Sequence, residues 1–494
     1  MDVRVSASML YDLVSCEHRP WMDLHADRAL RDPVNPFVEM LWRRGRMHED
    51  ELVREGAIEA PNLRETPIAE RAGRTLACMR AGVPLIYGGR LEVDDLVGEP
   101  DLLRLEAGGY VPGDIKSGSG EEGRADDRRP KKEYAVQLAL YVDALERLGF
   151  GAGRRAFVWD VDGEEVAYDL SLPKGPRTPS TFWDDYGECL ARARATIAGA
   201  DASAPAYSAT CKLCVWRSAC LATLERGDDL TLIPGLGRSK REPLLPHVPS
   251  ITALASAGPG RFLDGDGKSV VKGLGPDTLR KFHARAVLRS THGHPYLTRA
   301  LRLPQNPVEL FFDVETDPLR NHCYLHGFVE RRVDDPSAET YTAFFSAEPT
   351  EEAEREAFAA AWAFVRARRP CTIYIYSKYE RTWWRQLQQR HPDVCTADEV
   401  AELFGCGDVV DLYEVVETSS EWPTVDHSIK TLASYLGFAW RDPHPSGAAS
   451  IQWYESHLEG AQDAKQRILD YNEDDCRATR ILIDALRTMR VAAA

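Results

Sequence analysis

A strand–turn–strand stretch, Gly98–Ser117, places the tightest limit on the fold of this 494-residue chain. Two β-like runs, Leu102–Leu105 and Tyr110–Ile115, are separated by the pair Gly108-Gly109. Two apolar runs joined by such a turn signal predict a β-hairpin. The hairpin matters because acidic residues stand at the ends of both runs.

Asp101 precedes the first run, Asp114 closes the second, and Lys116 follows two positions later. Because strand residues two apart point to the same face, Asp114 and Lys116 project together, and the hairpin can bring Asp101 beside them. Two carboxylates suit Mg²⁺, and an ammonium group can orient a water and stabilise charge on a phosphate. A surface hairpin with a salt bridge has the same local sequence, so a catalytic interpretation needs further residues.

Further residues come from two predicted helices. His48 lies in an amphipathic helix predicted within residues 35–56, and Gln137 and Tyr141 are one turn apart on one helix face. Together with the hairpin, the residues follow the order His48, Asp101, Asp114-x-Lys116 and Gln137-x-x-x-Tyr141.

This order resembles the RecB/AddB-type nucleases of the PD-(D/E)xK superfamily. The resemblance implies a restriction-endonuclease-like domain over residues 1–229 that cleaves DNA with a bound metal. It places His48, Asp101 and Asp114 at the metal and makes Lys116 the partner of the catalytic base. Gln137 and Tyr141 would contact DNA or position the lysine.

Four of the 11 cysteines have the spacing of a metal site. Cys211, Cys214 and Cys220 supply three thiolates, and Cys16 supplies a fourth if the two ends of the domain meet. This spacing suits either zinc or an iron–sulfur cluster. The split arrangement resembles the iron–sulfur staple of AddB and of CRISPR-adaptation nucleases, which implies a [4Fe-4S] cluster that joins the ends of the domain.

Residues 230–302 hold two similar phrases, Ile233-Pro-Gly-Leu-Gly237 and Lys272-Gly-Leu-Gly275, each ahead of a predicted helix. Such turns offer backbone N–H groups to an anion, and they resemble the helix–hairpin–helix motif, which binds DNA phosphates. The residues assigned to nucleic-acid binding are Gly235, Gly237, Arg238, Lys240, Gly273, Gly275, Arg280 and Lys281. Residues 231–302 hold 12 Lys/Arg and 4 Asp/Glu, whereas the whole chain has a net charge of −16, which favours phosphate binding over a plain helical linker.

Residues 303–494 begin with an apolar strand in which Asp313 and Glu315 share one face. A buried strand seldom carries two such acids without a cation to neutralise them. In the last predicted helix, Tyr471 and Asp475 are neighbours at i, i+4. Further predicted elements are strands at 324–333, 340–345 and 372–376 and a helix at 351–368.

The set resembles the DEDD exonucleases of the ribonuclease-H-like fold, in particular the YprB-type branch. The resemblance implies two Mg²⁺ or Mn²⁺ ions on the carboxylates, with Tyr471 orienting the attacking water. Glu380 stands where the family has an aspartate, and Asp411 and Asp474 are the other candidates, although Asp411 equally suits a helix cap. Lys430 can contact a phosphate or lie on a solvated face.

The sequence therefore predicts an α/β multidomain protein: a restriction-endonuclease-like domain, a small all-α helix–hairpin–helix linker domain and a ribonuclease-H-like domain. We expect a cytoplasmic, metal-dependent exodeoxyribonuclease with two active sites that processes DNA ends or single strands, with DNA favoured over RNA. No apolar run has the length of a membrane span and no P-loop is present, so unwinding would need a helicase partner. The alternatives are a single active C-terminal site beside an N-terminal DNA clamp, or a non-enzymatic scaffold for repair or CRISPR-type proteins.

Overall fold

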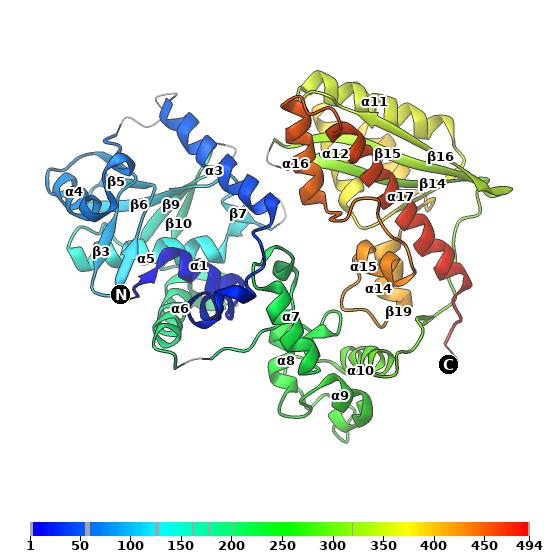
Figure 1. Ribbon diagram of the computed structural model, residues 1–494, viewed down its shortest axis with the longest axis horizontal. Coiled ribbons are helices and arrows are strands. Elements are labelled where there is room, and N and C mark those ends of the chain that lie inside the picture. Colours follow the sequence, from blue (N-terminus) through cyan, green and yellow to red (C-terminus); the bar gives the residue numbers. More distant parts are fainter. Residues whose placement is uncertain are drawn as a thin grey trace. The chain divides into compact units, whose positions relative to one another are not determined.

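The computed structural model describes residues 3–54, 60–123, 128–160, 163–175, 178–200, 202–318 and 320–492. The chain divides into two compact units, Met1–Leu221 and Ala222–Ala494 (Figure 1). The predicted small helical domain lies inside the second unit, so its boundaries at 229 and 302 stay a prediction.

The first unit is built on a five-stranded sheet of order β10-β9-β6-β5-β2. Its predicted hairpin is confirmed: β5 and β6 pair antiparallel, with Leu102 opposite Gly113, and the turn glycines have φ of 100° and 150°. The strands of this unit are β1 (Val5–Ser6), β2 (Leu85–Tyr87), β3 (Leu91–Val93), β4 (Leu96–Gly98), β5 (Leu102–Glu106), β6 (Gly109–Ile115), β7 (Glu121–Glu122), β8 (Arg129–Pro130), β9 (Arg155–Trp159), β10 (Glu165–Asp169), β11 (Pro173–Gly175) and β12 (Thr178–Thr181).

One helix, α5, forms the centre of the first unit. It contacts α1, α6 and β6, and its residues from Ala135 to Leu145 are buried with the exception of Gln137. A helix that is apolar on all sides is typical of a core position, and α5 accordingly holds Gln137 and Tyr141 against the hairpin. The helices of this unit are α1 (Ala7–Ser15), α2 (Arg19–His25), α3 (Pro36–Arg54), α4 (Ile68–Arg80), α5 (Lys132–Leu148), α6 (Phe182–Ile197) and, running into the second unit, α7 (Arg217–Arg226).

The second unit contains a five-stranded sheet of order β16-β15-β14-β17-β18. The pairs β14–β15 and β15–β16 are antiparallel, whereas β14–β17 and β17–β18 are parallel. The strands of this unit are β13 (Tyr296–Leu297), β14 (Val308–Asp317), β15 (His322–Arg332), β16 (Asp335–Phe345), β17 (Cys371–Ile375), β18 (Val409–Asp411) and β19 (Ser420–Glu421).

Helices cover both faces of this sheet (Figure 1). Leu310, Phe312 and Val314 of β14 join the core shared with α11, α12 and α13, whereas Phe311 joins the core shared with α14 and α17. The period of two therefore turns Asp313 and Glu315 toward α17. The helices of this unit are α8 (Arg238–Leu244), α9 (Ile251–Ala257), α10 (Pro276–Ser290), α11 (Glu351–Ala367), α12 (Tyr379–Arg390), α13 (Ala397–Gly405), α14 (Leu412–Ser419), α15 (Ile429–Tyr435), α16 (Gly447–Leu458) and α17 (Ala464–Thr488).

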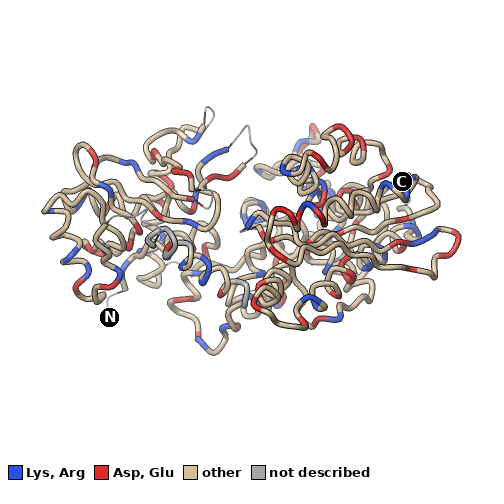
Figure 2. The backbone as a smooth tube through the Cα atoms, turned by 90° about the horizontal axis from the view of Figure 1, so that it is seen from above, with Lys and Arg blue, Asp and Glu red and all other residues tan. Residues whose placement is uncertain are grey.

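The helices of the described residues include none that is long and apolar enough to cross a lipid bilayer. In Figure 2, Lys and Arg alternate with Asp and Glu along the backbone of both units. The net negative charge is therefore not confined to one unit, and the candidate sites have to be judged from their local charges.

Candidate active sites

Three carboxylates of the second unit converge on one point. Asp313 and Glu315 come from β14 and Asp475 comes from α17, and one oxygen of each lies within 4.8 Å of the other two. Burial, and next the charge of Asp475, raises the pKa of Asp313 well above its usual range, and burial with Asp313 does the same for Glu315. Carboxylates this close oppose one another's ionisation unless a cation lies between them. Within the described residues, no other three potential metal ligands lie this close together.

Glu380 adds a fourth carboxylate from the first turn of α12. Its side chain is 2% exposed, and its Oε2 has no hydrogen-bond partner among the described residues. Burial, and next the charge of Asp313, raises the pKa of Glu380. A buried oxygen without a partner is costly, and a cation bound by Glu380 and Asp313 would remove that cost. Glu380 thus fits the place that the family gives to an aspartate.

Two further side chains, Lys430 and Trp440, donate hydrogen bonds to residues of this site. The Lys430 Nζ donates to the Tyr471 hydroxyl at 2.8 Å and lies 3.2 Å from the Asp475 Oδ2. The Trp440 Nε1 donates to the Asp475 Oδ1 at 2.7 Å. The pair Tyr471 and Asp475 was visible in the sequence as an i, i+4 pair, but Trp440 was not, because a lone tryptophan in a loop has no periodic signal.

Asn472 is a second residue that sequence reasoning missed. Its Nδ2 donates to the Asp313 Oδ2 at 2.7 Å, and its Oδ1 accepts from the Tyr341 hydroxyl at 2.9 Å. Gly327 lies opposite Asp313 in the β14–β15 register, and a Cβ at position 327 would come within 1.5 Å of the Asn472 Oδ1. A glycine is therefore needed in β15 so that α17 can approach the carboxylates closely.

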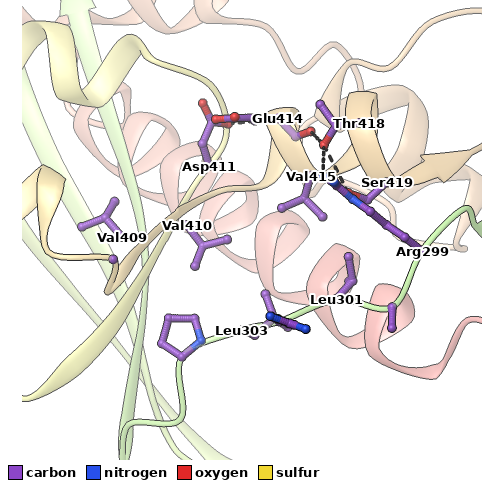
Figure 3. Close-up of a pocket in the computed structure, with 14 residues that line it drawn as sticks. Arg299, Leu301, Leu303, Val409, Val410, Asp411, Glu414, Val415, Thr418 and Ser419 are labelled. Carbon is purple, nitrogen blue, oxygen red and sulfur yellow. Dashed lines mark hydrogen bonds between the residues drawn. The ribbon is translucent and has the colours of Figure 1, made fainter.

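The two other candidate carboxylates have different partners. Asp411 caps α14 by accepting from the Tyr413 N–H at 3.0 Å, and it also accepts from the Ser377 N–H at 3.0 Å. It borders a cavity of about 640 Å³ in which Arg299 donates to Thr418 and Ser419 (Figure 3). Asp411 is thus the helix cap that the sequence allowed.

Asp474, although it adjoins Asp475, is held by a different residue. Its Oδ1 accepts from the Arg441 Nε at 2.9 Å, and its Oδ2 accepts from the Arg441 backbone N–H at 2.8 Å. Four carboxylates thus remain for the site, and among the described residues Lys430 is the cation that contacts them. Hard divalent cations such as Mg²⁺ or Mn²⁺ fit this all-oxygen, strongly negative set.

Replacing Glu380 with Gln is expected to raise the melting temperature of the metal-free protein and to reduce its stabilisation by Mn²⁺. The first effect follows because the change removes a buried carboxylate without a partner, at about 2–4 °C per kcal/mol in a unit of this size. The second follows because one ligand is lost, and a tenfold weaker Kd lowers stabilisation by about 1.4 kcal/mol. Thermal unfolding with and without Mn²⁺ measures both, and Glu352→Gln, at an exposed position of α11, is the control. Equal Mn²⁺ stabilisation of wild type and Glu380→Gln would exclude Glu380 as a ligand.

The predicted residues of the first unit also meet in one place. The pocket has a volume of about 310 Å³, and its walls include Asp101, Asp114, Lys116, Gln137 and Tyr141. The Asp101 Oδ2 accepts from the Ile115 N–H at 2.8 Å, and the Lys116 Nζ lies 2.9 Å from the Asp114 Oδ2. The hairpin therefore brings both aspartates and the lysine together, as its pattern predicted.

A short relay connects the lysine to α5. The Lys116 Nζ donates to the Gln137 Oε1 at 3.3 Å, and the Gln137 Nε2 donates to the Tyr141 hydroxyl at 3.2 Å. Burial lowers the pKa of Lys116, but Asp114 and Asp101 outweigh it, so the net shift is upward and the ammonium form is favoured. The relay favours a role for Gln137 and Tyr141 in positioning the lysine.

Sequence reasoning missed two residues of this pocket, Arg64 and Glu49. The Arg64 Nη2 lies 2.7 Å from the Glu49 Oε2 and donates to the Asp101 Oδ1. Burial, and next the charge of Asp114, raises the pKa of Asp101 to about 8 even with Arg64 beside it. His48 is on α3, but its side chain lies outside the described residues, so its predicted metal contact stays a prediction. The sequence offered one indication of Glu49, namely that it directly follows His48.

The four predicted cluster cysteines come from both ends of the first unit. Cys16 ends α1, Cys211 lies in a 3₁₀ turn that Cys214 ends, and Cys220 lies on α7. Burial raises the pKa of the Cys220 thiol, and next Cys214, Cys16 and Cys211 raise it further, so each of the three lies close enough to act on Cys220.

Backbone contacts fasten the cysteine segment to the start of the chain. The Asp32 N–H donates to the Val215 carbonyl at 2.7 Å, and the Trp216 Nε1 donates to the Asp23 Oδ1 at 2.8 Å. The Trp216 N–H points to the Cys214 Sγ at 3.5 Å. The ends of the unit therefore meet, which is the condition that the sequence set for Cys16 as a fourth ligand.

The two Gly-Leu-Gly phrases have the same backbone geometry. Gly235 and Gly273 have φ of 78° and 77°, and Gly237 and Gly275 cap α8 and α10 with φ of −75° and −77°. Only glycine adopts the first conformation without strain, so both phrases form one kind of turn.

The basic residues near these turns differ in their partners. The Lys240 Nζ donates to the Gly235 carbonyl at 2.7 Å, and Lys281 lies 3.1 Å from the Glu417 Oε2. Arg238 and Arg280 are near acidic residues of their own helices, at 3.8 Å and 2.5 Å. Lys281 is therefore less available to a phosphate than its sequence position suggested.

Models of two known protein families match the parts of the chain that contain the two sites. The model of the PD-(D/E)XK nuclease superfamily matches residues 14–221, and that of the RNase_H superfamily matches residues 310–487. No curated protein matches the chain. The matches cover both clusters of carboxylates, and they confirm the two domain resemblances and the mixed α/β fold class drawn from the sequence.

Proposed function

We propose that this chain, whose first domain belongs to the PD-(D/E)XK nuclease superfamily and whose second belongs to the RNase_H superfamily, is a metal-dependent nuclease that hydrolyses DNA chiefly at its C-terminal site. The observation that carries the proposal is the balance of charge in the two sites. This balance favours tighter metal binding at the C-terminal site than at the N-terminal site.

At the C-terminal site four carboxylates, Asp313, Glu315, Glu380 and Asp475, are accompanied by one contacting cation, Lys430. At the N-terminal site three carboxylates, Glu49, Asp101 and Asp114, are already balanced by Arg64 and Lys116. The first set gains most from two divalent ions, whereas a metal entering the second must displace Arg64.

The residues around the C-terminal site have separate tasks in this proposal. Bound Mg²⁺ or Mn²⁺ would activate the water and stabilise the leaving oxygen of the phosphodiester. Tyr471, held by Lys430, orients the water, and Trp440 and Asn472 fix the two carboxylates that they contact. The ammonium of Lys430 is also placed to offset negative charge on the scissile phosphate.

A [4Fe-4S] cluster in the first unit is part of the proposal. Four thiols lie near one another, and a backbone N–H points to one of the sulfurs, as is favourable for cluster thiolates. Zinc on the same four thiolates is the alternative that the spacing also allows, and the resemblance of the split arrangement to the iron–sulfur staple favours the cluster.

The backbone geometry of residues 230–302 favours a role in DNA binding over that of a plain helical linker. Two turns of equal geometry present backbone N–H groups at the starts of α8 and α10, beside Arg238 and Arg280. This arrangement suits phosphates of any sequence, as a nuclease that acts on ends or single strands requires.

The test is cleavage of end-labelled single- and double-stranded DNA by anaerobically purified protein. We expect Mn²⁺- or Mg²⁺-dependent hydrolysis that EDTA abolishes. Folded protein that binds DNA but leaves it intact with either metal would overturn the proposal and favour a non-enzymatic scaffold.

Replacing Arg64 with Met is expected to strengthen Mn²⁺ binding at the N-terminal site several-fold. The change removes the guanidinium that now pairs with Asp101 and Glu49, so a metal no longer has to displace it. Mn²⁺ titration of the Asp313→Asn background isolates the N-terminal site. Arg71→Met is the matched control, because Arg71 lines the same pocket but donates to Glu99 and to backbone carbonyls instead of to Asp101 and Glu49. Equal Mn²⁺ affinity of the two variants would show that Arg64 does not compete with the metal.

A further inference from the structure

A pocket that shares no residue with either carboxylate site contains an arginine that has no side-chain partner among the described residues. It has a volume of about 490 Å³ and lies where the C-terminal end of α10 meets the last residue of α15 and the segment before this helix, within the second unit. Its walls are Asp228, Arg289, Ser290, His292, Gly293, Pro423 and Tyr435. Neither Gly-Leu-Gly turn contributes to it, so it is distinct from the predicted phosphate-binding turns.

Arg289 gives the pocket a preference for anions. Among the described residues, its guanidinium donates no hydrogen bond and forms no ion pair, although Glu225 and Asp228 act on it from a distance. Burial, the largest effect, lowers the pKa of Arg289. A partly buried guanidinium with free N–H groups matches a phosphate oxygen pair. Asp228 is engaged elsewhere, since its Oδ2 accepts from the Thr252 N–H at 2.7 Å.

Tyr435 gives the pocket an aromatic wall. Tyr435 is the last residue of α15 and is 43% exposed. The buried Trp422 contacts the Tyr435 ring edge-on, with the two ring centroids 6.0 Å apart. An exposed ring with a fixed orientation is a stacking surface for a nucleobase, and such stacking does not depend on sequence. Ser290, the last residue of α10, and His292, on the turn after it, add hydrogen-bonding groups at the rim.

The same short helix connects the pocket to the C-terminal carboxylates. Lys430, which contacts Tyr471 and Asp475, is in the first turn of α15, and Tyr435 is at its end. Five residues of helix rise by about 7.5 Å and turn by about 140° beyond one full turn, so Lys430 and Tyr435 lie on different faces of α15. A strand that binds both has to pass around this short helix.

We propose that this pocket binds one nucleotide of a single-stranded DNA substrate, with its phosphate on Arg289 and its base stacked on Tyr435. The inference extends the proposed nuclease function by naming a substrate subsite, but its test does not require cleavage.

The test is fluorescence anisotropy with a labelled dT12 oligonucleotide in EDTA, over a range of salt concentrations. Tyr435→Leu should weaken binding on the order of tenfold, and Tyr435→Phe should restore it, because stacking needs only the ring. Arg289→Gln should weaken binding and reduce the magnitude of the salt slope by about 0.7, the value for one phosphate contact on a single strand. An abasic strand of equal length should lose the Tyr435 effect but keep the Arg289 effect.

Arg332→Gln is the control, because Arg332 is in the same unit but pairs with the exposed Asp334 outside the pocket. The inference is overturned if Arg332→Gln and Arg289→Gln weaken binding equally, or if Tyr435→Leu binds as wild type does. Melting temperatures identify any variant that fails to fold, and if Tyr435→Leu does so, the salt slope of Arg289→Gln decides the question. DNA binding that depends on Arg289 in a protein without nuclease activity would preserve this subsite and remove the proposed function.

Discussion

The Asp313→Asn variant is expected to lose Mn²⁺-dependent DNA cleavage at the C-terminal site by about a thousandfold or more. The charge of Asp313 acts on Glu315 and Glu380, that of Asp475 acts on Asp313, and Asn472 holds Asp313 in place. Stabilisation of the transition state by metal ions is worth several kcal/mol, and about 4 kcal/mol corresponds to a factor of a thousand. Single-turnover cleavage of end-labelled DNA measures the loss.

The same variant should be more stable than wild type in EDTA, because it removes one of several mutually repelling buried carboxylates. Mn²⁺ should then stabilise it less than it stabilises wild type. Loss of activity with gain of metal-free stability distinguishes a lost metal site from misfolding. Asp334→Asn, the same chemical change at an exposed position of this unit, should alter neither property.

Asp114→Asn completes this experiment. If the C-terminal site carries most of the activity, Asp114→Asn should retain most of the cleavage that Asp313→Asn loses. Stepwise loss in both variants would instead establish two working sites, as the sequence alone suggested. Full activity in Asp313→Asn, with none in Asp114→Asn, would contradict our assignment of the principal site.

The features predicted from sequence are those that depend on local periodicity. Asp313 and Glu315 share a face because strand residues alternate, and Tyr471 and Asp475 share a face because a helix turns every 3.6 residues. The structure brings Asp475 to the two strand acids, because the apolar residues between them fix which face meets α17.

The missed features depend on contacts between distant elements. Arg64 reaches Asp101 across 37 residues, and Trp440 reaches Asp475 across 35. Neither residue has a pattern in its own segment that indicates its partner. The contact of Lys281 with Glu417, 136 residues away, is equally invisible in its own segment, and its assignment to DNA stays a prediction.

Replacing Cys220 with Ser should remove the cluster and destabilise the first unit by several kcal/mol. We expect about four iron and four sulfide per chain in anaerobically purified wild type and little of either in the variant, with loss of the visible absorbance. The stability effect follows because cluster binding is coupled to folding, and because the cluster joins Cys16 to thiols roughly 200 residues away. For a disulfide, closing a loop longer than 100 residues is worth about 4–5 kcal/mol.

Cys189→Ser provides the matched control, because Cys189 packs against the core of the same unit. It should keep its iron and sulfide. If the wild type contains zinc and no sulfide, the site is the four-cysteine zinc site that the spacing also allows. If it contains neither iron nor zinc, both metal assignments are wrong. Because the cysteines belong to the first unit and the principal carboxylates to the second, Cys220→Ser should keep the cleavage that Asp313→Asn loses. Loss of cleavage in both variants would mean that the DNA-bound enzyme needs the folded first unit as a clamp.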